Sequence, residues 1–278
     1  MKIALSTLQA RHPAAAPAAA PVLRVEQLEV RAGEQLAVIG PSGAGKTTLL
    51  QVLACALPPS VGTLHLDGID PWAVRPAALQ ALRRALFLAP QVPPLPPRQR
   101  VVTAVLAGRL PHESLWASLR SLFYPHDIPL AHKALAAVDL ADKLFERVDR
   151  ISGGERQRVG LARLLVAQAS LWLVDEPLSA LDPTRARQVL HTLTRTAQER
   201  GATLVATLHQ VDMALAHFPR IVGLRDGAVA FDLPTAEVTP ALLHALYAQH
   251  LDELTSAAPA PWMEASAATP APVVMHCR

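Results

Sequence analysis

The chain has 278 residues, of which 51% are hydrophobic, 4% aromatic and 18% charged. This length allows one large domain or two small ones, and the apolar content is ample for a buried core, which excludes disorder throughout. Lys and Arg number 26 against 23 Asp and Glu, so the formal net charge is +3, too small to indicate a nucleic-acid partner. Because Cys55 and Cys277 lie far apart, no disulfide framework or zinc site is indicated, and we expect a reducing, cytosolic compartment.

The two ends of the chain differ in composition from the middle. Residues 13–21 read PAAAPAAAP, and residues 256–278 are rich in Ala, Pro and Ser. The N-terminus resembles a signal peptide only superficially, since Arg11 and His12 follow where a cleavage site would lie. We therefore expect a variable N-terminal arm over 1–21, a single domain over 22–250 and a disordered tail over 251–278.

Apolar runs begin the central part and lead into helical patterns. Residues 35–40 (QLAVIG) read as a strand that enters a glycine-rich turn, and residues 46–57 read as a helix stopped by two prolines. Residues 76–150 contain the apolar run ALFLAP at 85–90 but otherwise show mainly helical patterns. They predict an inserted helical subdomain.

The C-terminal half repeats the alternation of strand and helix. The runs LWLVDE (171–176) and TLVATLH (203–209) are continuously apolar, as expected of strands that are buried on both faces. Between them, Asp182 and a following proline begin a helix that ends at Gly201. The alternation predicts an α/β fold with a mostly parallel sheet. No stretch approaches the roughly 20 apolar residues of a membrane span; the longest candidate, 161–174, contains Arg163 and Gln168.

The strongest motif is a glycine-rich loop between a strand and a helix. GPSGAGKT fits the P-loop pattern G-x-x-x-x-G-K-[ST] in its required context, and it predicts binding of ATP. Lys46 can reach the β- and γ-phosphates, and the Thr47 hydroxyl can ligate Mg²⁺. The predicted nucleotide-binding residues here are Gly40, Pro41, Ser42, Gly43, Ala44, Gly45, Lys46, Thr47 and Thr48.

Two carboxylates end the strand at 171–176. Asp175 is placed to hold hydrated Mg²⁺, and Glu176 is a candidate general base for an attacking water. Alone, such a pair would more often cap a helix or lie on a solvated surface. Beside a P-loop, it predicts phosphoryl chemistry.

ISGGERQR, residues 151–158, adds a second anion site. Ser152 and Glu155 form an S-x-x-E capping box, which places Gly153 and Gly154 at a helix N-terminus. This segment resembles the signature sequence of ABC-type ATPases. That resemblance implies a P-loop NTPase fold and a head-to-tail dimer, in which the signature of one subunit faces the P-loop of the other.

Further elements of that family follow in order. Gln91 resembles the Q-loop glutamine, which senses Mg²⁺ and the attacking water, so it is assigned to both the catalytic and the metal site. SALD, ending at Asp182, resembles the loop that crosses the dimer interface, and His209 resembles the histidine that contacts the γ-phosphate. The family usually has an aromatic residue before the P-loop that stacks on adenine, but no Phe, Tyr or Trp precedes Trp72 here.

The stretches 104–123, 207–232 and 242–247 resemble the ATP-binding subunit of phosphonate importers. The resemblance implies an ATPase at the cytoplasmic face of the inner membrane, with two copies of this chain beneath two permease subunits. A periplasmic phosphonate-binding protein would act through the permease.

Three alternatives stay open. The solute could be phosphate, phosphite or another small molecule, because substrate selection lies in the partners. The chain could be a non-transport ABC protein acting on DNA or the ribosome, although it lacks a concentrated basic patch. It could also be a nucleotide-binding scaffold with poor turnover, which only the missing aromatic suggests.

Overall fold

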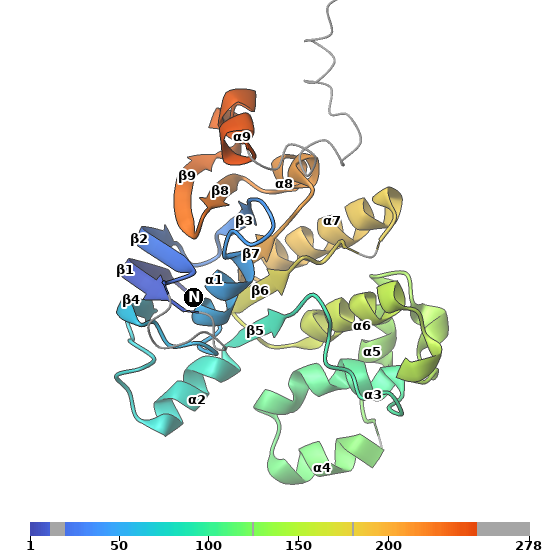
Figure 1. The fold of residues 1–278 in the computed structure, drawn as a ribbon. Helices are drawn as coiled ribbons and strands as arrows, with labels where there is room; N and C mark the ends of the chain where they lie inside the picture. The colour runs from blue at the N-terminus through green and yellow to red at the C-terminus, as the bar shows by residue number, and fades with distance from the viewer. Residues whose placement is uncertain (12–19, 124, 180, 249–278) are drawn as a thin grey trace, which may run out of the picture.

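The computed structural model describes residues 1–11, 20–123, 125–179 and 181–248. Within these ranges a nine-stranded sheet runs in the order β4-β1-β2-β9-β8-β3-β7-β6-β5 (Figure 1). The central strands pair in parallel, while β1, β2 and β4 form an antiparallel edge and β9 pairs antiparallel with β8. The strands are β1 Ile3–Ala10, β2 Leu23–Val30, β3 Gln35–Ile39, β4 Val61–Leu66, β5 Leu86–Ala89, β6 Leu171–Asp175, β7 Thr203–Thr207, β8 Arg220–Arg225 and β9 Ala228–Pro234.

Two apolar clusters lie on the opposite faces of this sheet. Successive residues of β3 divide between them: Ala37 and Ile39 belong to one cluster, and Leu36 and Val38 to the other. Side chains alternate across a strand, so a run that is apolar at every position is buried on both faces. This confirms the predicted α/β fold with a parallel core.

Residues 3–10 correct the prediction of an N-terminal arm over 1–21. They form β1, which lies inside the sheet between β2 and β4 with Ile3, Leu5, Leu8 and Ala10 fully buried. The buried positions change from odd to even because Thr7 adopts a positive φ of 50° and the register against β4 shifts there. This bulge interrupts the period of two by which a strand is recognised in a sequence. Of the expected arm, residues 12–19 lie outside the described residues, as does the tail predicted at 251–278.

The bulge also explains a glycine on the neighbouring strand. A Cβ atom at Gly62 of β4 would lie 2.3 Å from the carbonyl oxygen of Thr7, so only glycine fits opposite the bulge.

Helices cover both faces of the sheet. On one face α1 contributes Leu49, Leu50 and Leu53 to its cluster, and on the other α7 contributes Val189 and Leu190. None of the helices in the described ranges has both the length and the apolar character to cross a bilayer. The helices outside the helical subdomain are α1 Lys46–Leu53, α2 Pro76–Arg84, α7 Pro183–Glu199, α8 Val211–His217, the 3₁₀ turn η4 Thr235–Glu237 and α9 Pro240–Leu246.

The helix predicted over 46–57 ends at Leu53. Cys55 takes a positive φ of 54°, and the Ala56 N–H group donates a 2.9 Å hydrogen bond to the Gln51 carbonyl. This is the six-to-one bond of a Schellman motif, which closes the helix before its prolines are reached.

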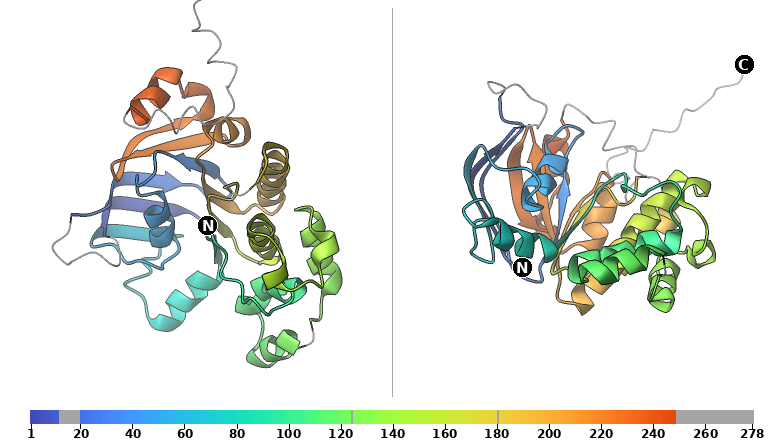
Figure 2. Two further views of the ribbon diagram at one scale, coloured as in Figure 1. Left: turned by 45° about the vertical axis from the view of Figure 1, so that its right-hand side comes forward. Right: turned by 90° about the horizontal axis from the view of Figure 1, so that it is seen from below.

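The helical subdomain has different bounds from the predicted 76–150. The strand β5 interrupts that range and pairs with β6, and α2 precedes it and packs against β5. The helices that gather to one side of the sheet therefore begin at Val101 (Figure 2). They are α3 Val101–Leu106, η1 Ala107–His112, α4 Leu115–Phe123, α5 Ile128–Ala136, η2 Ala141–Lys143, η3 Val148–Arg150 and α6 Gly153–Val166.

Candidate nucleotide site

The loop 40–47 connects β3 to the N-terminus of α1. Gly40, Gly43 and Gly45 all adopt positive φ values, of 152°, 81° and 96°. At Gly40 a Cβ atom would lie 2.0 Å from the Leu224 carbonyl oxygen of β8, so any side chain there would force the loop away from the sheet. The sequence therefore produces a tight backbone turn at a helix N-terminus, the geometry that suits a phosphate group.

Lys46 begins α1 and is only 5% exposed. Its Nζ atom donates hydrogen bonds to the carbonyl oxygens of Gly40 at 2.7 Å and Pro41 at 3.1 Å. The ammonium group is thereby held against the backbone of its own loop.

A cavity of about 460 Å³ lies on this loop and joins residues that are far apart in the sequence. Gln91 reaches it from the segment after β5, Glu176 from the end of β6 and His209 from the segment after β7. Parallel strands have their carboxyl ends at one edge of a sheet, which is where ligands bind in open α/β folds. The described residues that line the cavity are Val22, Ser42, Gly43, Ala44, Gly45, Lys46, Thr47, Thr48, Gln91, Glu176 and His209.

Glu176 is the centre of the polar contacts here. Its Oε2 accepts a hydrogen bond from Gln91 Nε2 at 2.8 Å, and its Oε1 lies 2.5 Å from His209 Nε2. The hydrogen bond from His209 holds the pKa of Glu176 below its ordinary value of 4.5, although partial burial acts in the opposite direction; the charge of Lys46 lowers it further. Glu176 is therefore ionised at neutral pH. Its backbone has a positive φ of 47°, a strained conformation for a non-glycine residue.

Asp175 lies beneath this group and does not line the cavity. It is 6% exposed, and its Oδ1 accepts a 2.7 Å hydrogen bond from the hydroxyl of Thr207. The same hydroxyl accepts a 3.0 Å bond from the Glu176 N–H group. Thr207 therefore fixes both carboxylate residues, and sequence reasoning missed it. Its only signal is its place in an apolar strand, at the position that pairs with Asp175.

Gln157 is a second residue that the sequence reasoning passed over. It lies in α6 within ISGGERQR and is 4% exposed. Its Nε2 donates to the Glu176 carbonyl at 2.7 Å and to Ser179 Oγ at 3.2 Å. It links the signature helix to the backbone that carries Glu176.

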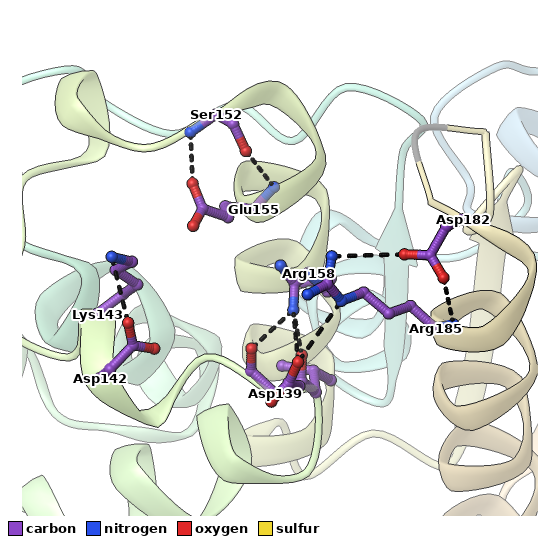
Figure 3. A network of polar contacts seen from close by, with 9 residues as sticks. Asp139, Asp142, Lys143, Ser152, Glu155, Arg158, Asp182 and Arg185 are labelled. Atoms are coloured by element: carbon purple, nitrogen blue, oxygen red, sulfur yellow. Dashed lines mark hydrogen bonds and ion pairs between the residues drawn. The ribbon is translucent and has the colours of Figure 1, made fainter.

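The predicted signature residues, Ser152, Gly153, Gly154 and Glu155, do not line the cavity. They begin α6, where the Ser152 N–H group donates to Glu155 Oε2 at 2.7 Å and the Glu155 N–H group to Ser152 Oγ at 3.2 Å (Figure 3). The backbone N–H of Ser152 lowers the pKa of Glu155. The capping box expected from the sequence is thus present, and a Cβ atom at Gly153 would meet no described heavy atom within 4 Å apart from its chain neighbours and its own helix backbone.

Asp182 also lies away from the cavity lining. It caps α7 by accepting hydrogen bonds from the N–H groups of Thr184 at 3.1 Å and Arg185 at 3.0 Å. The Arg185 N–H is the main cause of its lowered pKa. The Arg185 side chain lies between Asp182 and Asp139, which follows α5, and its ion pair with Asp139 joins α7 to the helical subdomain (Figure 3). Both pairs are exposed and contribute little stability.

A family model described as ABC transporter matches residues 23–179. The chain belongs to the ABC transporter family. It is an ABC-type ATPase with the P-loop NTPase fold, as the motifs predicted.

Full-length relatives place the chain among the phosphonates import ATP-binding proteins. It is 73% identical to Phosphonates import ATP-binding protein PhnC 2 of Albidiferax ferrireducens over 280 residues, which cover 100% of both chains. It is 69% identical to Phosphonates import ATP-binding protein PhnC of Polaromonas sp., again over 100% of both chains. A relative from Pseudomonas aeruginosa is 56% identical and covers 84% of this chain and 88% of its own.

Solved structures agree with this fold. A bacterial ABC transporter cassette, solved as a dimer, is 25% identical with a TM-score of 0.70 and covers 84% of this chain and 98% of its own. An Atm1-family ABC exporter with ATP bound is also 25% identical, with a TM-score of 0.72 over 91% of this chain and 42% of its own.

Val22 lines the cavity beside the loop 40–47, and no Phe, Tyr or Trp is among the described residues that line it. Trp72, the first Phe, Tyr or Trp of the sequence, packs instead against the apolar cluster on the α1 face of the sheet. His12 lies outside the described residues.

Proposed function

We propose that this chain hydrolyses ATP to energise phosphonate uptake, as a dimer bound to two permease subunits at the cytoplasmic face of the inner membrane. The observation that carries the proposal is the single cavity shared by Lys46, Gln91, Glu176 and His209. The names of the full-length relatives support phosphonate as the solute. A periplasmic phosphonate-binding protein would deliver the solute to the permease.

Phosphate groups would be held by the N–H groups of the loop 40–47 and by the positive end of α1. Lys46 is poised for this role, because its ammonium group is already buried at the loop and bound to two carbonyl oxygens. Transferring one of those hydrogen bonds to a phosphate oxygen needs only a side-chain rotation.

The residues present also fit a magnesium ion. Thr47 and Gln91 offer oxygen atoms at the cavity, and the buried carboxylate of Asp175 lies behind it, anchored at one oxygen by Thr207. Oxygen ligands and retained waters are what Mg²⁺ prefers. When bound, the ion neutralises phosphate charge. Asp175 would reach it through a water molecule, since it does not line the cavity.

Glu176 would take the proton of the attacking water. It is ionised at neutral pH, but both of its oxygens are occupied, one by Gln91 and one by His209. Each carboxylate oxygen can accept two hydrogen bonds, so the water can bind Glu176 beside these contacts or in place of one of them. We infer that Gln91 or His209 turns towards the nucleotide when it binds, which leaves one oxygen of Glu176 to the water alone.

Two copies are proposed because the second anion site lies outside the first. Ser152, Gly153, Gly154 and Glu155 lie at the start of α6 outside the nucleotide cavity, with open space at Gly153. In a head-to-tail pair they would close the cavity of the other copy, with Asp182 at the interface. The dimeric state of a related solved cassette supports this.

Solute uptake by the reconstituted complex tests this function. Vesicles containing the permease, the binding protein and this chain should accumulate a phosphonate in the presence of ATP, in preference to inorganic phosphate or phosphite. With Glu176→Gln in place of the wild-type chain, uptake should stop because the base is absent. Uptake of phosphate in preference to every phosphonate of the panel would reject phosphonate as the solute. Wild-type uptake with Glu176→Gln would reject the mechanism.

A further inference from the structure

Tyr247 is a buried aromatic residue from the C-terminal part of the chain, and its side chain reaches the nucleotide site. It follows α9 directly and is 1% exposed. Its hydroxyl oxygen accepts a 3.1 Å hydrogen bond from the N–H group of Gly40, which lies 207 residues earlier in the sequence. Gly40 is the first residue of the phosphate-binding loop.

The peptide groups of Gly40 connect this contact to Lys46. The N–H side of Gly40 is bound to Tyr247, and its carbonyl oxygen accepts the 2.7 Å hydrogen bond from Lys46 Nζ. The Leu224 carbonyl oxygen would lie 2.0 Å from a Cβ atom at Gly40, so the backbone of Gly40 is also packed closely against β8. One residue of backbone thus lies between the tyrosine hydroxyl and the lysine side chain.

The position of α9 is itself fixed. Leu243 and Leu246 are 1% and 2% exposed, and they pack in the same apolar cluster as Tyr247. Arg225, at the end of β8, donates a 2.7 Å hydrogen bond to the Ala245 carbonyl near the C-terminus of the helix. Figure 1 shows α9 above the β8–β9 hairpin, away from the helical subdomain. Tyr247 is therefore presented to the loop by a rigid element.

We propose that Tyr247 is a positioning residue for ATP hydrolysis: its hydroxyl orients Gly40, and Gly40 in turn orients Lys46. This inference rests on the proposed role of the loop 40–47. Without the hydroxyl, the N–H group of Gly40 is buried and unpaired, a costly state that the peptide relieves by rotating. The carbonyl on the other side of Gly40 then no longer directs Lys46 towards the transferring phosphate.

The test is Tyr247→Phe in the full-length chain, since this change removes one oxygen and keeps the ring. We expect kcat for ATP hydrolysis to fall about fivefold or more, with a smaller change in KM. The matched control is Thr235→Val, which removes a different side-chain hydroxyl that donates to a backbone carbonyl, that of Phe218, away from the loop. It should lower thermal stability to a similar extent and leave kcat unchanged.

A direct readout avoids dependence on activity. In protein labelled with ¹⁵N-glycine, the Gly40 amide of nucleotide-free Tyr247→Phe should exchange its hydrogen about tenfold faster than in the wild type. Wild-type kcat together with wild-type exchange would overturn the inference, as would a higher KM at unchanged kcat. The proposed role of the loop 40–47 is tested separately by Lys46→Ala. If that variant hydrolyses ATP at the wild-type rate, the proposed nucleotide site is rejected, independently of the result for Tyr247→Phe.

Discussion

At the scale of single residues, the catalytic centre depends on a threonine that belongs to no motif. Thr207 is fully buried, and its hydroxyl contacts both Asp175 and the backbone of Glu176. The proposed magnesium ligand and the proposed general base are thus oriented by one oxygen atom. Such a shared partner keeps two adjacent carboxylates pointing in different directions, one into the protein and one into the cavity.

Thr207→Val preserves shape and removes this oxygen. The buried carboxylate of Asp175 and the Glu176 N–H group then each lose a hydrogen bond, so we expect unfolding to become easier by about 1–3 kcal/mol. ATP turnover should fall about tenfold or more, because a misplaced base and metal ligand cost transition-state stabilisation. Urea denaturation and steady-state ATPase assays measure the two effects.

Two control variants sharpen that experiment. Thr207→Ser keeps the hydroxyl and should retain most of the activity. Thr194→Val removes a hydroxyl that donates to the Leu190 carbonyl within α7, far from the site, and should leave turnover unchanged. Full activity in Thr207→Val would mean that the two carboxylates are held by other contacts.

At the scale of elements, the N-terminal strand is part of the sheet that carries the site. β1 pairs with both β2 and β4 and contributes four fully buried side chains. It belongs to the apolar cluster that also contains Leu49 and Leu50 of α1, the helix that begins at Lys46. The first ten residues therefore pack in the same apolar cluster as the helix that follows the loop 40–47, and this packing supports the loop.

Leu5→Ala tests this role. Leu5 is 0% exposed, so the truncation should destabilise the protein by about 2–5 kcal/mol through lost burial and a residual cavity. The neighbouring Ser6→Ala is the control, since Ser6 is exposed and its replacement should cost no more than about 0.5 kcal/mol. Equal stabilities of the two variants in urea would show that the segment is the loose arm that its composition suggests.

At the scale of the whole molecule, one chain holds half of each proposed catalytic unit. The cavity contains the P-loop, the proposed base Glu176 and His209, while the capped N-terminus of α6 lies elsewhere with open space at Gly153. A second copy would supply the missing half to each cavity. ATP would then act as the bridge between the copies.

Glu176→Gln should therefore accumulate as an ATP-bound dimer, because hydrolysis no longer separates the copies. Adding Ser152→Ala should weaken this dimer about tenfold or more, as measured by analytical ultracentrifugation with ATP, because the hydroxyl at the second anion site is lost. Ser114→Ala is the matched control, since that hydroxyl also accepts a backbone N–H, from Ala117, in the same subdomain. Both changes remove a helix-capping bond worth about 1 kcal/mol, so an equal loss of dimer in both would reject the trans arrangement.

The sequence by itself determined the local part of this protein. The glycine-rich loop depends on backbone turns, and the caps at Ser152 and Asp182 on hydrogen bonds from backbone N–H groups to side chains. All of these span only a few residues, and all three features were predictable. The apolar runs before Gly40 and Glu176 likewise predicted strands that are buried on both faces. The family and the parallel fold followed from these segments.

Only the tertiary structure decided which of these segments meet. The bulge at Thr7 concealed β1, the register of β6 and β7 placed Thr207 beside Asp175, and α9 brought Tyr247 to Gly40. Each of these features depends on residues that are distant in sequence or lie on a paired strand, so neither the hydrophobic periodicity nor the motif spacing of the sequence predicts them. Helices, caps and tight turns are fixed by neighbours along the chain, whereas the site is fixed by neighbours across the sheet.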